Sequence, residues 1–415
     1  MKHPAAKPAP PARTAAPRSA RDLGIMQGFP PPPDKRPGAD TWDLPPFNRW
    51  SFQNMRALFP TVEVWKGTGA PRALPTEAAD ITDLSFNAAT QADHPQTIKQ
   101  WLDASYTDGF LVMQRGKIVF EHYANDMGLR TPHLSQSVAK SLVGALTGIL
   151  HHEGAVKLDV PLATIIPELA QCGYGDATLA QVLDMRSGVR FSEDYGTPGS
   201  DMTRIDIASG WRPPLPGEAV PTIRDVILTL PQERPHGEAF KYRSIETDVI
   251  AWVLERASGQ SLAALLSDRI WSRIGADCDG FFTIDRAGTA LADGGFNASL
   301  RDYARFGLMM LEGGAVGDQQ IVPEAWVRAS AKGDASAFGA PYTIASPNGA
   351  YSNQWWIQDV DRGDFMARGV FGQLIYLDPK TDFMAVKMST WPDFLIESYT
   401  LDTVRAVTTI RDALA

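Results

Sequence analysis

A serine and a lysine stand three positions apart in Ser137-Val138-Ala139-Lys140, at the start of an apolar run that predicts a buried helix. Residues three apart lie on one face of a helix, so the lysine amine can reach the serine hydroxyl. Backbone N–H groups and the helix dipole favour negative charge that develops at an N-terminal turn. Burial and the dipole both disfavour a charged lysine, so we expect Lys140 to move toward the neutral form that accepts a proton. Taken alone, the pattern also fits a helix cap followed by a lysine that reaches solvent.

A tyrosine further along the chain agrees with the catalytic interpretation. Tyr242-Arg243-Ser244 directly precedes a second predicted helix, residues 245–257. A tyrosine hydroxyl has a pKa of about 10, and it becomes a useful base only beside a cation such as Lys140. These residue types together indicate a serine nucleophile with a lysine and a tyrosine as proton carriers.

Other kinds of catalytic apparatus find no support in the sequence. The seven histidines end at His236, so the late histidine of an α/β-hydrolase is missing, as is its G-x-S-x-G turn. His151-His152-Glu153 lacks the spacing of H-E-x-x-H, and no phosphate-binding or dinucleotide-binding glycine motif occurs. Two cysteines, Cys172 and Cys278, provide neither a disulfide framework nor a cysteine-rich metal site. The sequence therefore predicts no metal and no cofactor.

Net charge and composition restrict the kinds of partner that the protein is expected to bind. The net charge of −9 argues against nucleic acid, because proteins that bind it carry a basic surface. The longest nearly uncharged apolar stretch, residues 141–150, is too short to span a bilayer. Residues 1–40 hold ten of the 31 prolines and lack the apolar region of a secretory signal. We therefore expect a cytoplasmic protein that acts on a small molecule and has no membrane partner.

The elements that must position these residues follow from the hydrophobic pattern. Residues 110–114 and 118–123 flank Arg115-Gly116-Lys117 and predict a hairpin. A helix over residues 138–152 is expected to end at Gly154. Strands, then helices, then strands predict a mixed sheet assembled from both halves of the chain, with a helical insertion. Further helices are expected over residues 179–185, 245–257, 262–274, 300–312 and 398–414, and further strands over residues 354–358, 373–377 and 383–388.

The predicted domains follow this order of elements. Residues 1–40 are expected to form a Pro-rich arm that is disordered or wrapped on the surface. Residues 41–154 and 291–415 are expected to form a sheet-containing α/β domain. Residues 155–290 are expected to form a mainly helical domain, with Tyr242 at the boundary between the two.

Several longer strings, some with unusual tryptophans, carry a resemblance to a known family. They are Trp42–Trp50, Ser192–Tyr195, Asp206–Arg212, Tyr242–Asp248, Gln354–Trp356 and Ser389–Asp393. With the S-x-x-K, they resemble the class C β-lactamase and family VIII carboxylesterase group, and most of all its 6-aminohexanoate-dimer (nylon-oligomer) hydrolases. The resemblance implies an α+β, β-lactamase/transpeptidase-like fold, in which an antiparallel sheet is flanked by helices beside an all-helical second domain. It also implies a possible homodimer.

The resemblance also assigns catalytic roles. Ser137 matches the nucleophile, Lys140 its proton partner, and Tyr242 the base that later delivers a proton to the leaving amine. The backbone N–H groups of Ser137 and Val370 match the oxyanion hole. The implied reaction is acylation and deacylation of a serine without a cofactor.

A second set of positions matches substrate-binding residues of the family. Tyr195 matches a loop residue that closes over the substrate and hydrogen-bonds the nitrogen of the scissile amide. Asp206 matches an acidic position that faces the ammonium end of amino-acid oligomers, where a cation entering a partly dry pocket requires a charge partner. A solvated loop charge is the alternative for Asp206. Ser244, Asp293 and Gly369 complete the predicted substrate-binding residues.

Three positions depart from the family pattern. Asp293 stands where efficient nylon-dimer hydrolases have Asn, and a second carboxylate there would alter the charge of the pocket. Phe371 follows the oxyanion position where a polar residue is expected, which would make that wall more apolar. Ala367-Arg368-Gly369 replaces K-T-G, which removes the lysine that β-lactamases place beside the substrate carboxylate. Arg368 is a candidate to take its place. Lys380-Thr381-Asp382 imitates K-T-G but has Asp in place of Gly and falls in a predicted turn.

The expected activity is hydrolysis of a short linear amide with an amino terminus, such as the 6-aminohexanoate dimer. The alternative is a short-chain carboxylesterase that uses the same residues. A β-lactamase, a D-amino-acid peptidase or an inactive binding protein fits less well, because Ser137, Lys140 and Tyr242 are all present while the K-T-G lysine is not.

Overall fold

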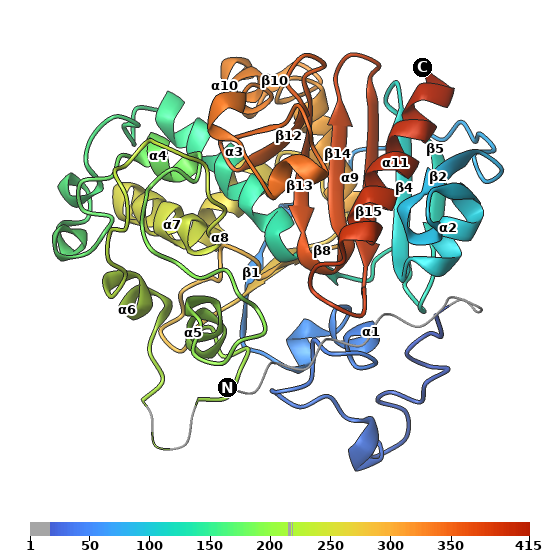
Figure 1. The fold of residues 1–415 in the computed structure, drawn as a ribbon, viewed down its shortest axis with the longest axis horizontal. Helices are drawn as coiled ribbons and strands as arrows, with labels where there is room; N and C mark the ends of the chain where they lie inside the picture. Colours follow the sequence, from blue (N-terminus) through green and yellow to red (C-terminus); the bar gives the residue numbers. More distant parts are fainter. Residues whose placement is uncertain (1–16, 215–216, 218) are drawn as a thin grey trace.

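A seven-stranded sheet forms the centre of the computed structural model, which describes residues 17–214, 217 and 219–415 (Figure 1). Every neighbouring pair in this sheet is antiparallel, so the mixed sheet predicted from the order of elements is wrong. The late strands follow one another through short turns, and such turns can join only antiparallel neighbours. The strands in spatial order are β11 (Ala350–Ser352), β12 (Trp355–Asp359), β13 (Asp364–Gly369), β14 (Gln373–Asp378), β15 (Phe383–Ser389), β4 (Thr107–Gln114) and β5 (Lys117–Tyr123).

The predicted hairpin is present as β4 and β5. Its two turn residues, Arg115 and Gly116, have φ values of 50° and 74°. Two successive positive φ values are typical of the type I′ turn, whose twist matches that of the flanking strands. Since β15 pairs with β4, this hairpin joins the early part of the chain to the late strands.

Alternate residues of the sheet face two different layers of helices. Leu374 and Tyr376 of β14 belong to the apolar cluster that includes residues of α2 (Ile98–Ala104) and α11 (Glu397–Leu414). Ile375 and Leu377 belong instead to the larger cluster that includes α3 (Ala139–His152) and α9 (Leu300–Leu311). This alternation is the two-residue period of a strand buried on both faces. Figure 1 shows α2 and α11 together beside β4 and β5.

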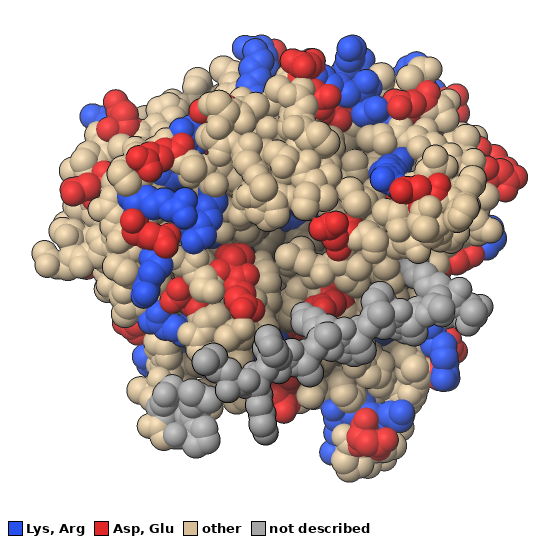
Figure 2. Space-filling view, viewed as in Figure 1, with Lys and Arg blue, Asp and Glu red and all other residues tan. Residues whose placement is uncertain are grey.

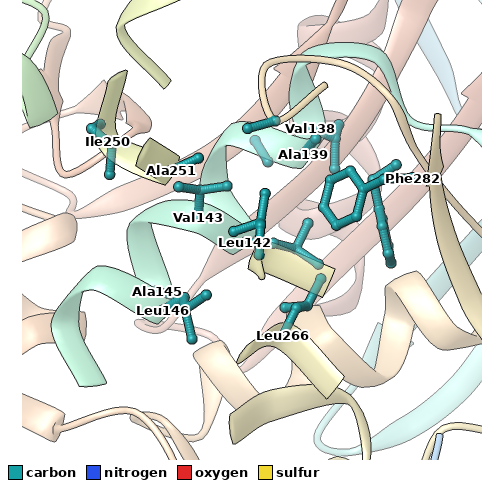
Figure 3. Packing of buried hydrophobic residues seen from close by; sticks show 14 of the residues in the cluster. Val138, Ala139, Leu142, Val143, Ala145, Leu146, Ile250, Ala251, Leu266 and Phe282 are labelled. Atoms are coloured by element: carbon teal, nitrogen blue, oxygen red, sulfur yellow. The ribbon is translucent and has the colours of Figure 1, made fainter. Parts of the chain in front are cut away.

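Helix α3 carries the S-x-x-K lysine and lies in the middle of the larger cluster. A short 3-10 turn, η4 (Gln136–Val138), leads into it, and its residues are buried from Ala139 to Leu150. Its apolar side chains pack against α7 (Ile245–Ser258), α8 (Leu262–Leu266) and the strand β7 (Gly280–Thr283), as Figure 3 shows. A helix that is apolar on all sides is expected to be buried in this way. The helix ends at His152, just before Gly154 with φ of 76°, as predicted.

The range predicted to be mainly helical, residues 155–290, also contributes a strand. Its helices are α4 (Leu179–Leu183), α5 (Asp201–Ala208), α6 (Ile223–Leu228), α7 and α8. The predicted helix over residues 262–274 changes after Leu266 into a π-helical turn over Ser267–Trp271. Strand β7 (Gly280–Thr283) follows, in a second sheet of order β1-β7-β8-β6 with β1 (Thr61–Val64), β8 (Phe296–Ala298) and β6 (His133–Leu134).

The beginning of the chain contacts the body of the protein. Residues 1–16 of the predicted arm lie outside the described residues. In the part that follows, the Ala20 N–H donates to Asn125 Oδ1 at 2.8 Å, and Ile25 is buried. Smaller elements elsewhere are α1 (Asn48–Ser51), β2 (Ser85–Ala88), β3 (His94–Thr97), β9 (Ala315–Val316), β10 (Gln319–Gln320) and α10 (Glu324–Ser330). Within the described ranges, every helix is too short or too polar to cross a membrane.

Candidate active site

The serine and the lysine of the S-x-x-K motif are in direct contact. Lys140 Nζ donates to Ser137 Oγ at 2.9 Å and to the backbone oxygen of Asp293 at 2.5 Å. Ser137 lies in the η4 turn and Lys140 in the first turn of α3, so local helical geometry sets their separation. The lysine is buried, whereas the serine lines a cavity. The alternative of a lysine that reaches solvent is therefore wrong.

Two backbone features place the end of β13 against this turn. Gln136, directly before Ser137, has φ of 47°, a left-handed conformation that costs a non-glycine residue about 1–3 kcal/mol. Gly369, the last residue of β13, lies so close that a Cβ there would be 2.7 Å from Ser135 O and 3.0 Å from Ser137 N. Only glycine allows this approach, which brings the backbone of the neighbouring Val370 to the serine.

Tyr242 lines the same cavity as Ser137 and lies beside Lys140. Its hydroxyl is near enough to Ser137 and Lys140 for both to lower its pKa, and Lys140 Nζ lies 5.4 Å from the centre of its ring. The ring stacks on Trp356 with centroids 5.2 Å apart, and the Tyr242 N–H donates to Tyr342 Oη at 3.1 Å. Burial raises the pKa of Tyr242, although the charge of Lys140 acts to lower it. Strands and helices from distant parts of the chain thus hold the phenol at the serine.

The expected direction of the Lys140 pKa is wrong. Burial acts to lower this pKa, as predicted, but the electrostatic interaction of the amine with Tyr242 and with the carboxyl groups of Asp293, Glu193 and Asp248 raises it by more, so the net shift is upward. The prediction considered only burial and the helix dipole, because the sequence does not show which carboxyl groups surround the amine. Lys140 is therefore an ammonium in the resting site.

A cavity of about 470 Å³ opens beside Ser137. Figure 2 shows one face of the molecule hollowed near its centre, with acidic side chains beside the hollow. The cavity runs from the serine toward α11, and two residues on its lining, Leu395 and Ile344, are 64% and 49% exposed although they are large and apolar. Such a lining suits an elongated aliphatic ligand. The other lining residues are Ser137, Glu193, Tyr195, Tyr242, Pro341, Tyr342, Ala345, Trp356, Met366, Arg368, Gly369, Val370, Gly372, Gln373, Leu374, Trp391, Glu397, Thr400, Thr403 and Val404.

Asp206 does not belong to this lining. It is buried on α5, with Oδ2 3.8 Å from Arg212 Nε, and Arg212 also forms an ion pair with Asp43. Burial raises the pKa of Asp206 to about 8, while Arg212 acts to lower it. The alternative of a solvated loop charge is therefore wrong. Asp206 is a buried carboxyl group that already faces one cation.

Asp293 accepts a hydrogen bond from Lys140 through its backbone oxygen, and like Asp206 it does not line the cavity. Burial raises the pKa of Asp293, although Lys140 acts to lower it. Its neighbour is Asp248 of α7, whose Oδ1 accepts from the Ala292 N–H at 2.9 Å. Burial and the nearby Asp293 raise the pKa of Asp248, and its buried Oδ2 has no hydrogen-bond partner within the described ranges. The sequence reasoning missed Asp248, six positions after Tyr242 on the same helix that this tyrosine precedes.

Glu193 is the second residue that the sequence reasoning missed, and it does line the cavity. Its Oε1 accepts from the Tyr195 hydroxyl at 2.6 Å and from Ser244 Oγ at 2.5 Å. Its Oε2 accepts from the Ser244 N–H at 2.8 Å. Ser244 thus contacts a cavity residue without lining the cavity itself, whereas Tyr195 lines it with its ring stacked on Phe394 at 5.1 Å. The sequence offered one signal for Glu193: it precedes Tyr195 by two residues, and side chains two apart in an extended segment point to the same side.

The structure also decides the departures near the oxyanion position. Phe371 is 1% exposed and packs on Phe52 and Phe394, so the prediction that it makes the pocket wall more apolar is wrong. Arg368 does line the cavity, with its guanidinium 5.0 Å from the centre of the Trp356 ring. Within the described part of the chain it has neither a hydrogen bond nor an ion pair. Lys380 lies in the β14–β15 turn, as predicted, at the end of β14 away from Gly369.

The described residues contain no group of three or more His, Cys, Asp or Glu side chains that could hold a metal ion. What the arrangement offers instead is a hydroxyl beside an ammonium and a phenol, with the backbone of two segments converging on the same point. These are the parts needed for nucleophilic attack on a carbonyl carbon and for moving the protons involved.

Comparisons with known proteins agree with this geometry. A family model described as beta-lactamase matches residues 98–397. The chain is 34% identical over 384 residues to a 6-aminohexanoate-dimer hydrolase of Paenarthrobacter ureafaciens, which covers 92% of this chain and 93% of that protein. Its fold is similar to that of a Bacillus anthracis protein provisionally described as a 6-aminohexanoate-dimer hydrolase, with a TM-score of 0.82, 27% identity, and 91% and 98% of the two chains covered. A family VIII carboxylesterase shares the fold with a TM-score of 0.55 at 15% identity, over 72% of this chain and 91% of that one. The α+β fold implied by the resemblance is confirmed.

Proposed function

The chain belongs to the beta-lactamase family and is a hydrolase, and from this premise we propose that it cleaves short linear amides through an acyl-enzyme on Ser137. The contact of Lys140 Nζ and the Tyr242 hydroxyl with Ser137 Oγ at the wall of a cavity carries the proposal. A serine hydroxyl is a weak nucleophile until a neighbouring group takes its proton.

Lys140 and Tyr242 act as one proton-carrying pair. Both pKa values are raised, so the resting pair is an ammonium beside a neutral phenol. When this coupled pair has released one proton to water, it is a base that takes the proton of Ser137 Oγ as the oxygen attacks the carbonyl carbon. The charge of the lysine stabilises the pair when the tyrosine is the group without its proton.

The negative charge of the tetrahedral intermediate falls on the carbonyl oxygen. The N–H groups of Ser137 and Val370 are the proposed donors, since Gly369 brings this part of the backbone to the serine. Loss of one such donor typically costs about 2.7–4 kcal/mol of transition-state stabilisation. Tyr242 then protonates the leaving nitrogen, the carbon–nitrogen bond breaks, and water later cleaves the ester on Ser137 to release the acid.

The proposed substrate is an amide with a charged group at each end, such as the 6-aminohexanoate dimer on which the Paenarthrobacter relative is named to act. Arg368 supplies a cation on the cavity wall without a partner among the described residues, which suits the carboxylate end. Asp206, beside Arg212, and the Asp293 carboxyl group beneath Lys140 form an acidic region for the ammonium end. Glu193 adds to this negative field, because it also raises the pKa of Asp206.

A short-chain carboxylesterase is the second candidate. The exposed apolar residues Leu395 and Ile344 on the cavity lining favour it, because a neutral alkyl ester would cover them without needing any charged partner. The same serine, lysine and tyrosine would perform the reaction.

The first prediction tests the acyl-enzyme. A fluorophosphonate probe is expected to label the wild-type protein on Ser137, and Ser137→Ala is expected to lose both this label and turnover by about a thousandfold or more. The measurements are the mass of the labelled peptide and the initial burst with a nitrophenyl ester. Equal labelling of the variant would contradict the proposal. The ratio of dimer turnover to ester turnover by the wild type then decides between amidase and esterase.

Two further properties stay predictions for solution experiments. A homodimer would give twice the mass of the chain in light scattering, and a cytoplasmic location would place the protein in the soluble fraction of fractionated cells.

A further inference from the structure

The charged side chains that line the cavity differ in whether they already have partners. Among the described residues they are Glu193, Arg368 and Glu397. The carboxylate of Glu193 accepts three hydrogen bonds. Within the described ranges, neither the Arg368 nor the Glu397 side chain has a hydrogen bond or an ion pair. The cavity wall thus offers a cation and a carboxylate that a ligand can engage.

Arg368 lies on the face of the sheet that α11 covers. Met366 and Leu374, which also line the cavity, are buried in the apolar cluster that includes residues of α11. Arg368 follows Met366 by two positions on β13 and pairs with Leu374 of β14, so its side chain shares their face of the sheet. This face forms an apolar wall with one cation on it.

Glu397 approaches the same part of the cavity from the helix. It is the first residue of α11, and Thr400 and Val404 follow it three and seven positions later. Such positions lie on one face of a helix, and all three side chains line the cavity. We call this part of the cavity the α11 compartment, and it is lined by Met366, Arg368 and Leu374 of the sheet and by Glu397, Thr400 and Val404 of α11.

A ligand that matches these walls is a linear aliphatic chain with a carboxylate at one end and an ammonium at the other. In the intact dimer, the nitrogen of the unit that carries the carboxylate belongs to the amide and has no charge. Cleavage changes this, because Tyr242 protonates the nitrogen, the carbon–nitrogen bond breaks and the leaving group becomes a primary amine. Such an amine has a pKa close to that of lysine, about 10.4, so it takes a further proton from water at neutral pH. The released 6-aminohexanoate is therefore a zwitterion.

We propose that the α11 compartment binds the released ω-amino acid as a zwitterion, with its carboxylate at Arg368 and its ammonium at Glu397, so that the enzyme is inhibited by its product. The choice of ligand rests on the proposed function, which supplies this amino acid, whereas the two unpaired charges do not depend on it. Arg368 serves the carboxylate before and after cleavage. Glu397 gains its partner only when the amide has become an amine, so it favours product over substrate.

The experiment compares three linear molecules of similar length that differ in their end groups: 6-aminohexanoate, hexanoate and 1-aminohexane. Their inhibition constants are measured against turnover of a nitrophenyl ester, and their dissociation constants by calorimetry, which requires no turnover. The wild type is expected to bind 6-aminohexanoate about tenfold more tightly than either of the others, because each of these lacks one ionic contact.

Two variants remove the contacts one at a time. Glu397→Gln is expected to weaken the binding of 6-aminohexanoate about tenfold and that of hexanoate less than about twofold, since only the ammonium contact is lost. Arg368→Gln should weaken 6-aminohexanoate and hexanoate about tenfold and leave 1-aminohexane within about twofold. In each variant, the molecule that keeps its affinity shows that the compartment is still formed, and thermal unfolding detects any loss of the fold.

A matched control is Glu324→Gln. Glu324 is the first residue of α10, as Glu397 is of α11, but it does not line the cavity. A carboxylate in the first turn also stabilises a helix through its dipole, and both substitutions remove such a charge. Glu324→Gln should leave the binding of all three molecules unchanged.

Equal affinity of the wild type for 6-aminohexanoate and hexanoate would overturn the inference, as would a Glu397→Gln variant that weakens both alike. Loss of 6-aminohexanoate binding in Asp206→Asn but not in Glu397→Gln would also overturn it. Each of these results leaves the hydrolase proposal intact. If 6-aminohexanoate binding depends on Glu397 but the wild type neither labels with the fluorophosphonate nor cleaves the ester, the zwitterion site stands, and its role as a product site falls with the proposed function.

Discussion

The reacting groups and the acidic groups of the site are built in different ways. Lys140 donates to Ser137 at 2.9 Å and Tyr242 lies beside both, so short distances define what these three proposed reacting groups can do. The buried acidic residues, Asp206, Asp248 and Asp293, come from separate segments, and burial raises the pKa of each. Among the residues that the structure describes, Arg212 at 3.8 Å is the cation paired with Asp206, and Asp248 Oδ2 has no hydrogen-bond partner.

The proposed reacting groups and the buried carboxyl groups are therefore expected to act over different distances. A hydrogen bond to the transition state is lost when its atoms move by less than an ångström. The influence of a buried carboxyl group reaches further and depends on its protonation state. Damage to the reacting groups is therefore expected to affect every substrate alike, whereas damage to the acidic groups should depend on substrate charge and on pH.

Apart from loss of the proposed nucleophile itself, the largest effect is expected from Gly369→Ala. The added Cβ would lie 2.7 Å from Ser135 O, so the end of β13 must move away from the η4 turn. Displacement of the Val370 N–H is expected to lower kcat on the order of a hundredfold, for amide and ester alike. Steady-state kinetics on both substrates checks the prediction.

The matched control is Gly69→Ala, where a Cβ meets nothing within 4 Å. It should keep kcat within about twofold of the wild type, as surface substitutions usually do. A Gly369→Ala enzyme with unchanged kcat would mean that the approach of β13 to the serine is not needed for the reaction.

A smaller and selective effect is expected from Asp206→Asn. The neutral side chain keeps its shape but cannot ionise to meet an ammonium group, so kcat/KM for the dimer should fall about tenfold. A neutral alkyl ester of the same length should lose less than about twofold. The ratio of the two kcat/KM values is the measurement, and equal losses would remove Asp206 from ammonium binding.

A second effect of the same substitution concerns stability. In the unfolded chain an aspartate loses its proton at about pH 4, whereas folded Asp206 holds it up to about pH 8. Between these values the folded state binds the extra proton, so stability falls as pH rises through this window. Asparagine does not titrate. The free energy of unfolding of the variant, relative to that of the wild type, should therefore rise by on the order of 1 kcal/mol per pH unit within this window. Urea unfolding at pH 5 and pH 8 checks this, and a difference that does not grow with pH would contradict it.

Local patterns predicted the elements well where packing agreed with them. The β4–β5 hairpin, the α3 helix and the late strands β12, β14 and β15 lie where alternation and apolar periodicity indicated. Two features differ from the prediction: the sheet is antiparallel rather than mixed, and strand β7 lies in the range expected to be mainly helical. Strands pair with residues far apart in the chain, so local patterns do not reveal this pairing. A period of two identifies a strand but does not identify its neighbour.

The site shows the same division. The three-residue spacing of Ser137 and Lys140 was enough to predict their contact, since one helical turn sets it. The roles of Glu193 and Asp248 escaped prediction because a carboxyl group in a sequence does not reveal what it faces. The Phe371 prediction was wrong for a related reason: with φ of 61° at this position, its ring turns into the core beside Phe52.

By itself, the sequence determined the kind of chemistry, because residue types at helical spacing place a hydroxyl and an amine within reach of each other. It also indicated the family, which agrees with the 34% identity to a 6-aminohexanoate-dimer hydrolase over 92% of the chain. Only the tertiary structure decided the protonation of Lys140 and the partners of Asp206 and Tyr195. These depend on charges and donors brought together from distant segments, and electrostatic interactions follow distance in space rather than distance along the chain.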